Sequence, residues 1–92
     1  MTAEKNKRLD LFMADQANED IAWWSTNDQN VLNRINKLID NCRESPFSGI
    51  GKPEPLKHNL SGLWSRRITK EHRLVYQVAV GTLFVLSCRY HY

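Results

Sequence analysis

The sequence predicts a small α+β domain in which a two-helix hairpin packs on one face of a twisted, mostly antiparallel sheet. Three observations support this fold class. The 92 residues can enclose one hydrophobic core but not two. Apolar residues in the middle of the chain recur with the period of an amphipathic helix, and three strand-like runs joined by short turns fill the final third. We therefore expect one domain over residues 1–92, with the element order β-α-α-β-β-β.

The first part of the chain contains short sequence patterns that indicate an extension, a strand and a helix. Residues 1–8 are mostly polar and are expected to form a flexible N-terminal extension. Apolar residues then alternate over residues 9–13, which indicates a short strand. Asp15 can cap a helix whose apolar positions Ile21 and Trp24 recur at helical spacing.

The clearest helix signal lies just before Pro46. One apolar stripe runs along this segment and consists of Val31, Leu32, Ile35, Leu38, Ile39 and Cys42. Asn27 or Asp28 is the expected N-cap, and Pro46 ends the helix because the residue before a proline disfavours the helical conformation. We expect this stripe and the tryptophan pair at positions 23 and 24 to cover the sheet and form the core.

The final third of the chain predicts the sheet. Residues 47–55 are rich in glycine and proline, which indicates an irregular loop. Strand-like runs follow over residues 63–68, 72–78 and 82–90. Because the connections between these runs are short, neighbouring strands are expected to be antiparallel.

Alternation along the strands sorts their side chains into two faces. In the last run, the expected core face carries Phe84, Leu86, Cys88 and Tyr90. The expected open face of that run carries Leu83, Val85, Ser87, Arg89 and His91. In the middle run, Leu74, Tyr76 and Val78 form the apolar set, which places Arg73 on the opposite face.

This arrangement predicts a polar cluster on the face that the helices leave open. Arg73, Arg89 and His91 are expected to converge there from adjacent strands. Glu54 and Lys57 can reach the same face from the preceding loop. A carboxylate, an imidazole and several cations are together suited to handling a phosphodiester.

The distribution of charge agrees with an anionic partner. Residues 1–50 hold six Lys and Arg against eight Asp and Glu, whereas residues 51–92 hold seven against two. A basic half joined to a mildly acidic half is typical of a domain with one face for nucleic acid. A small sheet edged with solvated lysines and arginines would have the same composition.

Cysteine and histidine usage predicts a protein with reduced thiols and no metal or other cofactor. Cys42 and Cys88 do not make a disulfide framework, and neither an apolar leader nor a membrane-spanning window occurs. No CxxC or HxxxH spacing is present. We therefore expect a cytoplasmic protein that does not insert into membranes.

Three stretches resemble one known family. They are residues 51–68 (GKPEPLKHNLSGLWSRRI), residues 71–76 (EHRLVY) and residues 88–92 (CRYHY). These stretches are similar to the YoeB toxins of the RelE/ParE superfamily of bacterial toxin–antitoxin systems. The resemblance implies a ribosome-dependent endoribonuclease that cuts mRNA in the decoding site and is silenced by an antitoxin of the YefM/Phd type. It also leaves a homodimer open.

The resemblance assigns roles residue by residue. Glu54 matches the general base, His91 the general acid, Arg73 the phosphate-stabilising arginine and Tyr92 an active-site tyrosine. Lys57 and Arg67 match basic residues around the scissile phosphate. The convergence argued above adds Arg89 as a residue that binds substrate.

Each assignment has a structural alternative. Glu54 could be a loop carboxylate paired with Lys52 or Lys57, His91 a frayed terminal residue, and Arg73 a surface strand arginine. At the level of function, ParE-type relatives share the fold but inhibit DNA gyrase without catalysis. A plain RNA-binding module would bind the ribosome without cutting mRNA.

Overall fold

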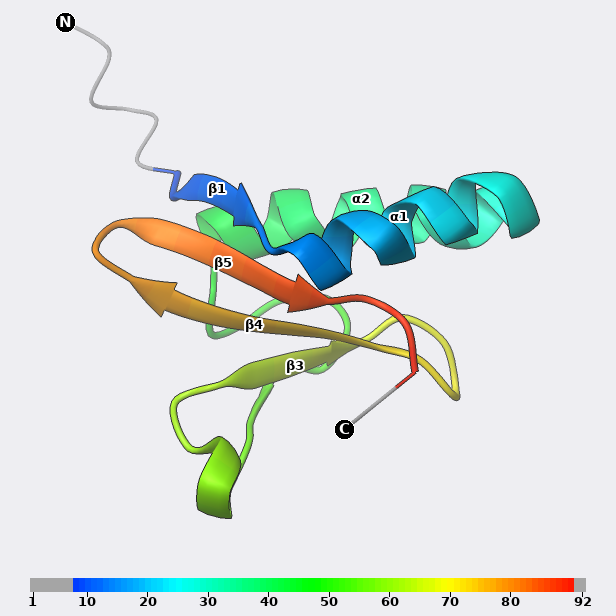
Figure 1. The fold of residues 1–92 in the computed structure, drawn as a ribbon. Coiled ribbons are helices and arrows are strands. Elements are labelled where there is room, and N and C mark those ends of the chain that lie inside the picture. The colour runs from blue at the N-terminus through cyan, green and yellow to red at the C-terminus, as the bar shows by residue number, and fades with distance from the viewer. Residues whose placement is uncertain (1–7, 91–92) are drawn as a thin grey trace, which may run out of the picture.

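The computed structural model describes residues 8–90 (Figure 1). Its elements are β1 (Asp10–Met13), α1 (Asp15–Asn27), α2 (Gln29–Glu44), β2 (Glu54–Pro55), the 3-10 turn η2 (His58–Leu60), β3 (Trp64–Arg67), β4 (Arg73–Ala79) and β5 (Thr82–Ser87). The strands form one sheet in the order β1-β5-β4-β3-β2. β1 runs parallel to β5, and the other neighbours are antiparallel. Both helices lie along one side of this sheet (Figure 1), which confirms the expected α+β architecture.

The two helices form where the sequence predicts them, with one difference at the start of α1. The buried residues of α2 are Ile35, Leu38, Ile39 and Cys42. Asp28 caps α2, since its Oδ1 accepts a hydrogen bond from Val31 N at 3.2 Å. The N-cap of α1 is Ala14, so Asp15 lies in the first turn instead of the cap position. Within residues 8–90, no helix is long and apolar enough to cross a membrane.

The core between helices and sheet contains two residues that we expected on the open face. Leu83 and Val85 are fully buried, whereas Phe84 and Leu86 are only partly buried. The expected faces of β5 are therefore exchanged over this stretch. The middle strand agrees with expectation, because the apolar set of β4 packs in or against the same core.

A β-bulge explains the exchange. Val75 pairs with Ser87, but the next residue, Tyr76, pairs with Val85, so Leu86 has no partner in the ladder. One extra residue in a strand shifts the inward and outward alternation by one position. The assumption of uninterrupted alternation over residues 82–90 therefore assigned the wrong face to the residues before the bulge.

β5 ends at Ser87, three residues earlier than expected. Beyond the bulge, Cys88 points into the core, as predicted. Its N–H donates to Asp20 Oδ2 at 2.9 Å, and its carbonyl accepts from Trp24 Nε1 at 2.8 Å. Both backbone groups of Cys88 thus bind side chains of α1 instead of a neighbouring strand, and the ladder stops.

The loop predicted over residues 47–55 contains the short strand β2. Glu54 and Pro55 pair with Ser65 and Trp64 of β3 at the edge of the sheet. An edge position tolerates proline because it requires no ladder hydrogen bond from that residue. A strand of two residues, one of them a proline, is too short to show the alternation of apolar and polar residues that identifies a strand. This strand was therefore not predicted.

A fully buried arginine, Arg66, holds the segment between α2 and β2. Its guanidinium donates to Asn41 Oδ1 of α2 at 2.6 Å. It also donates to the carbonyls of Ser45, Ser48 and Ile50. Tyr76 Oη accepts from Arg66 Nε at 3.3 Å and donates to Pro46 O at 2.7 Å. The position of this loop therefore depends on one buried cation and its acceptors.

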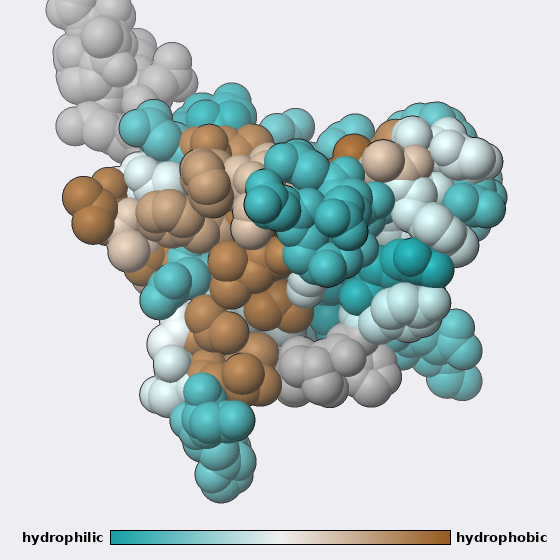
Figure 2. All heavy atoms as spheres, in the orientation of Figure 1, coloured by the Kyte–Doolittle hydropathy of each residue, from teal (hydrophilic) through white to brown (hydrophobic). Residues whose placement is uncertain are grey.

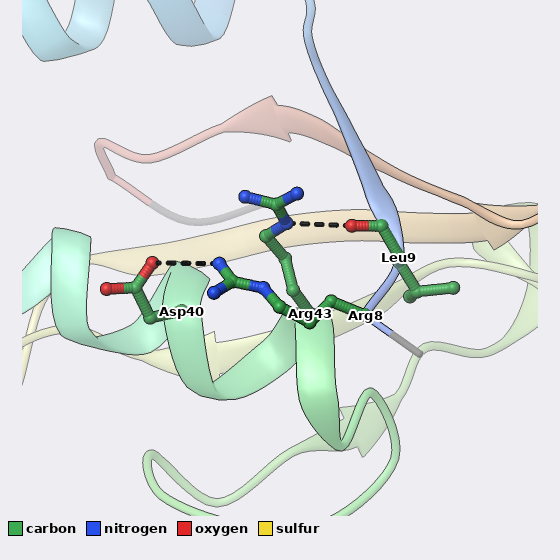
Figure 3. A network of polar contacts seen from close by, with 4 residues as sticks. All are labelled: Arg8, Leu9, Asp40 and Arg43. Atoms are coloured by element: carbon green, nitrogen blue, oxygen red, sulfur yellow. Dashed lines mark hydrogen bonds and ion pairs between the residues drawn. The ribbon is translucent and has the colours of Figure 1, made fainter. Parts of the chain in front are cut away.

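The residues before β1 are joined to the C-terminal end of α2 (Figure 3). Arg43 Nε donates to Leu9 O at 2.7 Å, and Leu9 N donates to Arg43 O at 3.0 Å. Arg8 forms an ion pair with Asp40 at 3.8 Å. Of the expected N-terminal extension, Arg8 therefore has a defined contact, and residues 1–7 lie outside the described residues.

Exposed apolar side chains gather near β1 and the β4–β5 hairpin. Figure 2 shows apolar atoms over this part of the molecule. Phe12 is 53% exposed, and its ring lies 5.5 Å from that of Phe84. Leu11 and, at the hairpin tip, Val80 are also exposed. Apolar surface of this kind is typical of protein–protein interfaces.

Both cysteine thiols are buried, which predicts that they resist alkylation. Burial, with a further contribution from Asp20, raises the pKa of Cys88 to about 12, and burial raises the pKa of Cys42. At pH 8 both thiols therefore stay neutral, and the thiolate is the reactive form. We expect no iodoacetamide labelling of the native protein within hours and complete labelling in denaturant, measured by mass spectrometry. Rapid labelling of the native protein would contradict this packing.

Candidate active site

Three neighbouring strands place a carboxylate beside two arginines. Glu54 pairs with Ser65 across β2 and β3, and Arg67 pairs with Arg73 across β3 and β4. Ser65 and Arg67 are two residues apart on one strand, so they and their partners share a face. A small polar concavity on this face is lined by Lys52, Glu54, Ser65, Arg67 and Arg73. The structure thus brings together three of the predicted site residues.

Alternation along β3 gives two adjacent arginines different surroundings. Arg66 is fully buried on the helix-covered face, whereas Arg67 is exposed on the face of the concavity. The guanidinium of Arg66 already donates hydrogen bonds to Asn41 and to neighbouring backbone carbonyls. Of these two arginines, Arg67 is therefore the one that faces a bound anion.

The charges lining the concavity are unbalanced. Lys52, Arg67 and Arg73 are cationic, and Glu54 is the one carboxylate among the lining residues. Within residues 8–90, no ion pair of 4.0 Å or less joins Glu54 to a cation. Arg67 and Arg73 stand directly opposite each other, an arrangement of like charges that is unfavourable without an anion between them. The concavity is therefore suited to an anionic ligand.

The turn between β3 and β4 orients Arg73. Its Nη1 donates to the carbonyls of Thr69 at 3.0 Å, Lys70 at 3.3 Å and His72 at 3.2 Å. One edge of the guanidinium is thus fixed by the backbone. Among the described residues, no hydrogen bond from the Nε or Nη2 group of Arg73 is present.

Lys52 is a site residue that sequence reasoning considered only as an ion-pair partner of Glu54. It reaches the concavity because Gly51 tucks the loop against α2 and β3, where Gly51 O accepts from Arg67 N at 2.6 Å. A Cβ at Gly51 would lie 2.7 Å from Leu38 Cδ2, so a larger residue would displace the loop. The available signal was its proximity to Glu54, which lies two positions further along the chain.

Lys57 lies outside the concavity of the arginines. It lines an adjacent hollow formed by residues 54–60, and Glu54 borders both. Lys57 is exposed and flanks the carboxylate from the side of η2. Its contact with the scissile phosphate stays a prediction.

Arg89 does not join Arg73, and the expectation of their convergence is wrong. Its guanidinium lies 3.7 Å from the centre of the Trp23 ring and 4.7 Å from that of Tyr90, and its Nη2 donates to Tyr90 Oη. The sheet ends before this residue, so strand alternation no longer sets its direction. Trp23, expected in the core with its neighbour, is instead 37% exposed.

The described chain ends beside Arg73. Tyr90 O accepts a hydrogen bond from Arg73 N at 2.8 Å. His91 and Tyr92, the predicted general acid and active-site tyrosine, lie outside the described residues. No cluster of three or more potential metal-ligating side chains occurs within residues 8–90.

A family model described as the YoeB-like toxin of bacterial type II toxin–antitoxin systems matches residues 13–92 of the chain. The chain belongs to the YoeB toxin family. It is thus a toxin of a toxin–antitoxin system. The matched residues include every predicted site residue. The chain is also 51% identical over 84 residues to toxin YoeB of Escherichia coli strain K12, which covers 91% of this chain and 100% of the relative.

Solved structures of family members have the same fold. The YoeB/ParE toxin from Agrobacterium tumefaciens superposes with a TM-score of 0.87 at 44% identity, covering 91% of this chain and 100% of that one. The YoeB dimer from Staphylococcus aureus gives 0.84 at 44% identity, with 92% and 99% coverage. A YoeB–YefM complex from the same organism gives 0.82 at 44% identity, again with 92% and 99% coverage.

Proposed function

We propose that this toxin is a ribosome-dependent endoribonuclease that cuts mRNA in the decoding site by metal-independent acid–base catalysis. The observation that carries the proposal is the shared concavity of Glu54, Arg67, Arg73 and Lys52. It combines one group able to take a proton with three cations able to bind a phosphate. A non-enzymatic inhibitor of gyrase would not require this combination.

The reaction uses the nucleophile that RNA itself carries, the 2′-hydroxyl group. Glu54 takes the proton of this hydroxyl, and the 2′-oxygen attacks the adjacent phosphorus. The bond from phosphorus to the 5′-oxygen breaks, and His91 gives that oxygen a proton. The products are a 2′,3′-cyclic phosphate and a 5′-hydroxyl.

The cations stabilise the charge that develops during attack. Negative charge grows on the non-bridging oxygens of the phosphorane, and Arg67 and Arg73 provide N–H donors toward them. Lys52 adds a third positive charge beside Glu54. Tyr92 adjoins the general acid in the chain and is assigned to the site for substrate contact.

The ribosome supplies the geometry of the substrate. In-line attack requires the 2′-oxygen opposite the leaving oxygen, and relaxed single-stranded RNA rarely holds it there. Fixed orientation of reacting groups can lower the activation free energy of a reaction by about 7–11 kcal/mol. The toxin therefore acts on translated mRNA in the cytoplasm, where Lys57 binds the message or the ribosome beside the site.

Two protein partners complete the proposal. The YoeB proteins of Staphylococcus aureus have been solved as a dimer and in complex with YefM. By analogy, an antitoxin of the YefM/Phd type binds this chain and silences it. A second copy of the chain would bind through exposed apolar surface such as that around Phe12.

The test is a primer-extension map of mRNA from a translating extract. Wild-type toxin should produce new 5′ ends within translated codons and none on untranslated RNA. His91→Gln and a truncation lacking residues 91–92 should each lose roughly 10²-fold or more of this cleavage. Stripping transition metals at constant magnesium should leave the wild-type rate unchanged.

Thermal unfolding and ribosome binding, measured for all three proteins, show whether a loss is chemical. His91→Gln cleaving within a few-fold of wild type would remove His91 from the mechanism. An extract in which gyrase is inhibited and mRNA stays intact would replace the proposal with the gyrase alternative.

A further inference from the structure

Two consecutive residues, one just before β4 and one at its start, hold both backbone groups of Tyr90. Tyr90 N–H donates to His72 Nδ1 at 2.6 Å, and Arg73 N–H donates to Tyr90 O at 2.8 Å. Tyr90 has φ +62°, a conformation uncommon for a residue with a side chain, so its surroundings must maintain it. The backbone leading into residue 91 is therefore set by His72 and Arg73.

The imidazole of His72 is held on more than one side. Its ring meets the ring of Trp24 edge-on, with 4.8 Å between centroids, and lies 5.4 Å from the ring of Tyr90. Its backbone belongs to the β3–β4 turn, where His72 O accepts from Ile68 N at 2.9 Å. Thr69 Oγ1 accepts from His72 N at 3.2 Å. The acceptor is thus presented to Tyr90 in a fixed direction.

The hydrogen bond also decides the tautomer of His72. A backbone N–H can only donate, so Nδ1 must accept and carries no proton. The ring proton is then on Nε2. To accept the hydrogen bond from the Tyr90 N–H, the side chain at position 72 needs an acceptor atom at the position of Nδ1.

Side chains of α1 hold the residue two positions earlier. Cys88 N–H donates to Asp20 Oδ2, and Cys88 O accepts from Trp24 Nε1. Together with the bonds of Tyr90, four hydrogen bonds fix the chain after β5 has ended. We call His72, Arg73, Asp20 and Trp24 the C-terminal clamp. Between Ser87 and Tyr90, where the described residues end, the chain belongs to no strand, so the clamp fixes the backbone that precedes His91 in the chain.

We propose that His72 is a positioning residue: by accepting the Tyr90 N–H, it fixes the backbone from which the proposed general acid, His91, follows in the chain. This inference rests on the proposed function, in which His91 is the general acid. His72 acts through the main chain of Tyr90 and does not touch the substrate. Its removal therefore lowers the rate of proton delivery and leaves the cationic face intact.

Three variants of the full-length toxin test the role of the acceptor. His72→Phe keeps an aromatic ring against Trp24 but has no acceptor. His72→Asn places its amide oxygen close to the position of Nδ1. His72→Gln places its oxygen nearer to the position of Nε2 and is the matched control for polarity at the wrong place.

We expect His72→Phe and His72→Gln to lower kcat for mRNA cleavage by about 10- to 100-fold, because the general acid is misplaced. KM should stay near the wild-type value, since the groups that bind phosphate are unchanged. His72→Asn should recover kcat to within a few-fold of wild type. Hydrogen exchange of the Tyr90 amide should be faster in the Phe and Gln variants and near wild type in the Asn variant.

The proposal would be overturned by a wild-type kcat in His72→Phe, or by unchanged protection of its Tyr90 amide. Equal losses of kcat in folded His72→Asn and His72→Gln would also overturn it. If His72→Phe does not fold, the comparison of these two variants decides whether the proposal holds. If wild-type toxin cleaves no mRNA, the proposed function fails. Exchange of the Tyr90 amide then decides by itself whether His72 holds the chain end.

Discussion

Replacing Glu54 with glutamine is expected to lower the rate of mRNA cleavage by about 10²- to 10⁴-fold, the contribution of one general base. Glutamine keeps the shape of the side chain and can accept a hydrogen bond, but it cannot take the proton of the 2′-hydroxyl. Glu54 is exposed at the sheet edge, so its substitution should leave the unfolding temperature nearly unchanged. Single-turnover cleavage on programmed ribosomes measures the effect.

The matched control is Glu71→Gln. Glu71 is the other carboxylate of residues 51–92, is also exposed, and does not line the concavity. The Glu71→Gln substitution changes the net charge by the same amount as Glu54→Gln. Comparing the two variants therefore separates the loss of the base from the effect of net charge on RNA binding. Glu54 would not be the base if Glu54→Gln cleaved at the rate of Glu71→Gln.

The neighbouring arginines of β3 should respond in opposite ways to the same substitution. Arg66→Met removes the donor that Asn41 and three loop carbonyls share, in a fully buried place. We expect a loss of at least about 3 kcal/mol in the free energy of unfolding. For a domain of this size, such a loss lowers Tm by more than about 10 °C.

Arg67→Met should instead leave Tm within a few degrees and lower cleavage by about 10- to 10²-fold, because Arg67 is exposed and lines the concavity in which we propose that phosphate binds. Calorimetry or urea unfolding measures stability, and cleavage at a temperature where both variants are folded measures activity. Equal stability of the two variants would show that Arg66 does not hold the loop. Full activity of Arg67→Met would remove Arg67 from the site.

The helices and the order of elements could be predicted because their signals are local. The apolar stripe of α2 spans about three turns, and Asp28 lies at the position where its side chain caps the helix. The short turns of the final third likewise required antiparallel neighbours. In each case, residues close in the chain interact with one another, so their pattern is sufficient.

The site was predicted in part for a different reason. Alternation and the preceding loop placed Arg73 and Glu54 on one face, and the resemblance of residues 51–76 to a family added Arg67 and gave all three their roles. The pairing of β2, β3 and β4 places them together. Arg89 was chosen through strand alternation, which holds only while a residue is in a ladder. Once β5 ends, that argument has no physical basis.

The sequence by itself determined the fold class, the two helices, the basic half of the chain and the residue types needed to cut a phosphodiester. These follow from composition, period and motif. Only the tertiary structure decided the face of Leu83 and Val85, the placement of Lys52, and the C-terminal clamp on Tyr90. Each depends on hydrogen bonds between residues distant in sequence, such as Cys88 with Asp20 and Tyr90 with His72. Register and bulges are set by such long-range partners, and alternation along one strand does not contain them.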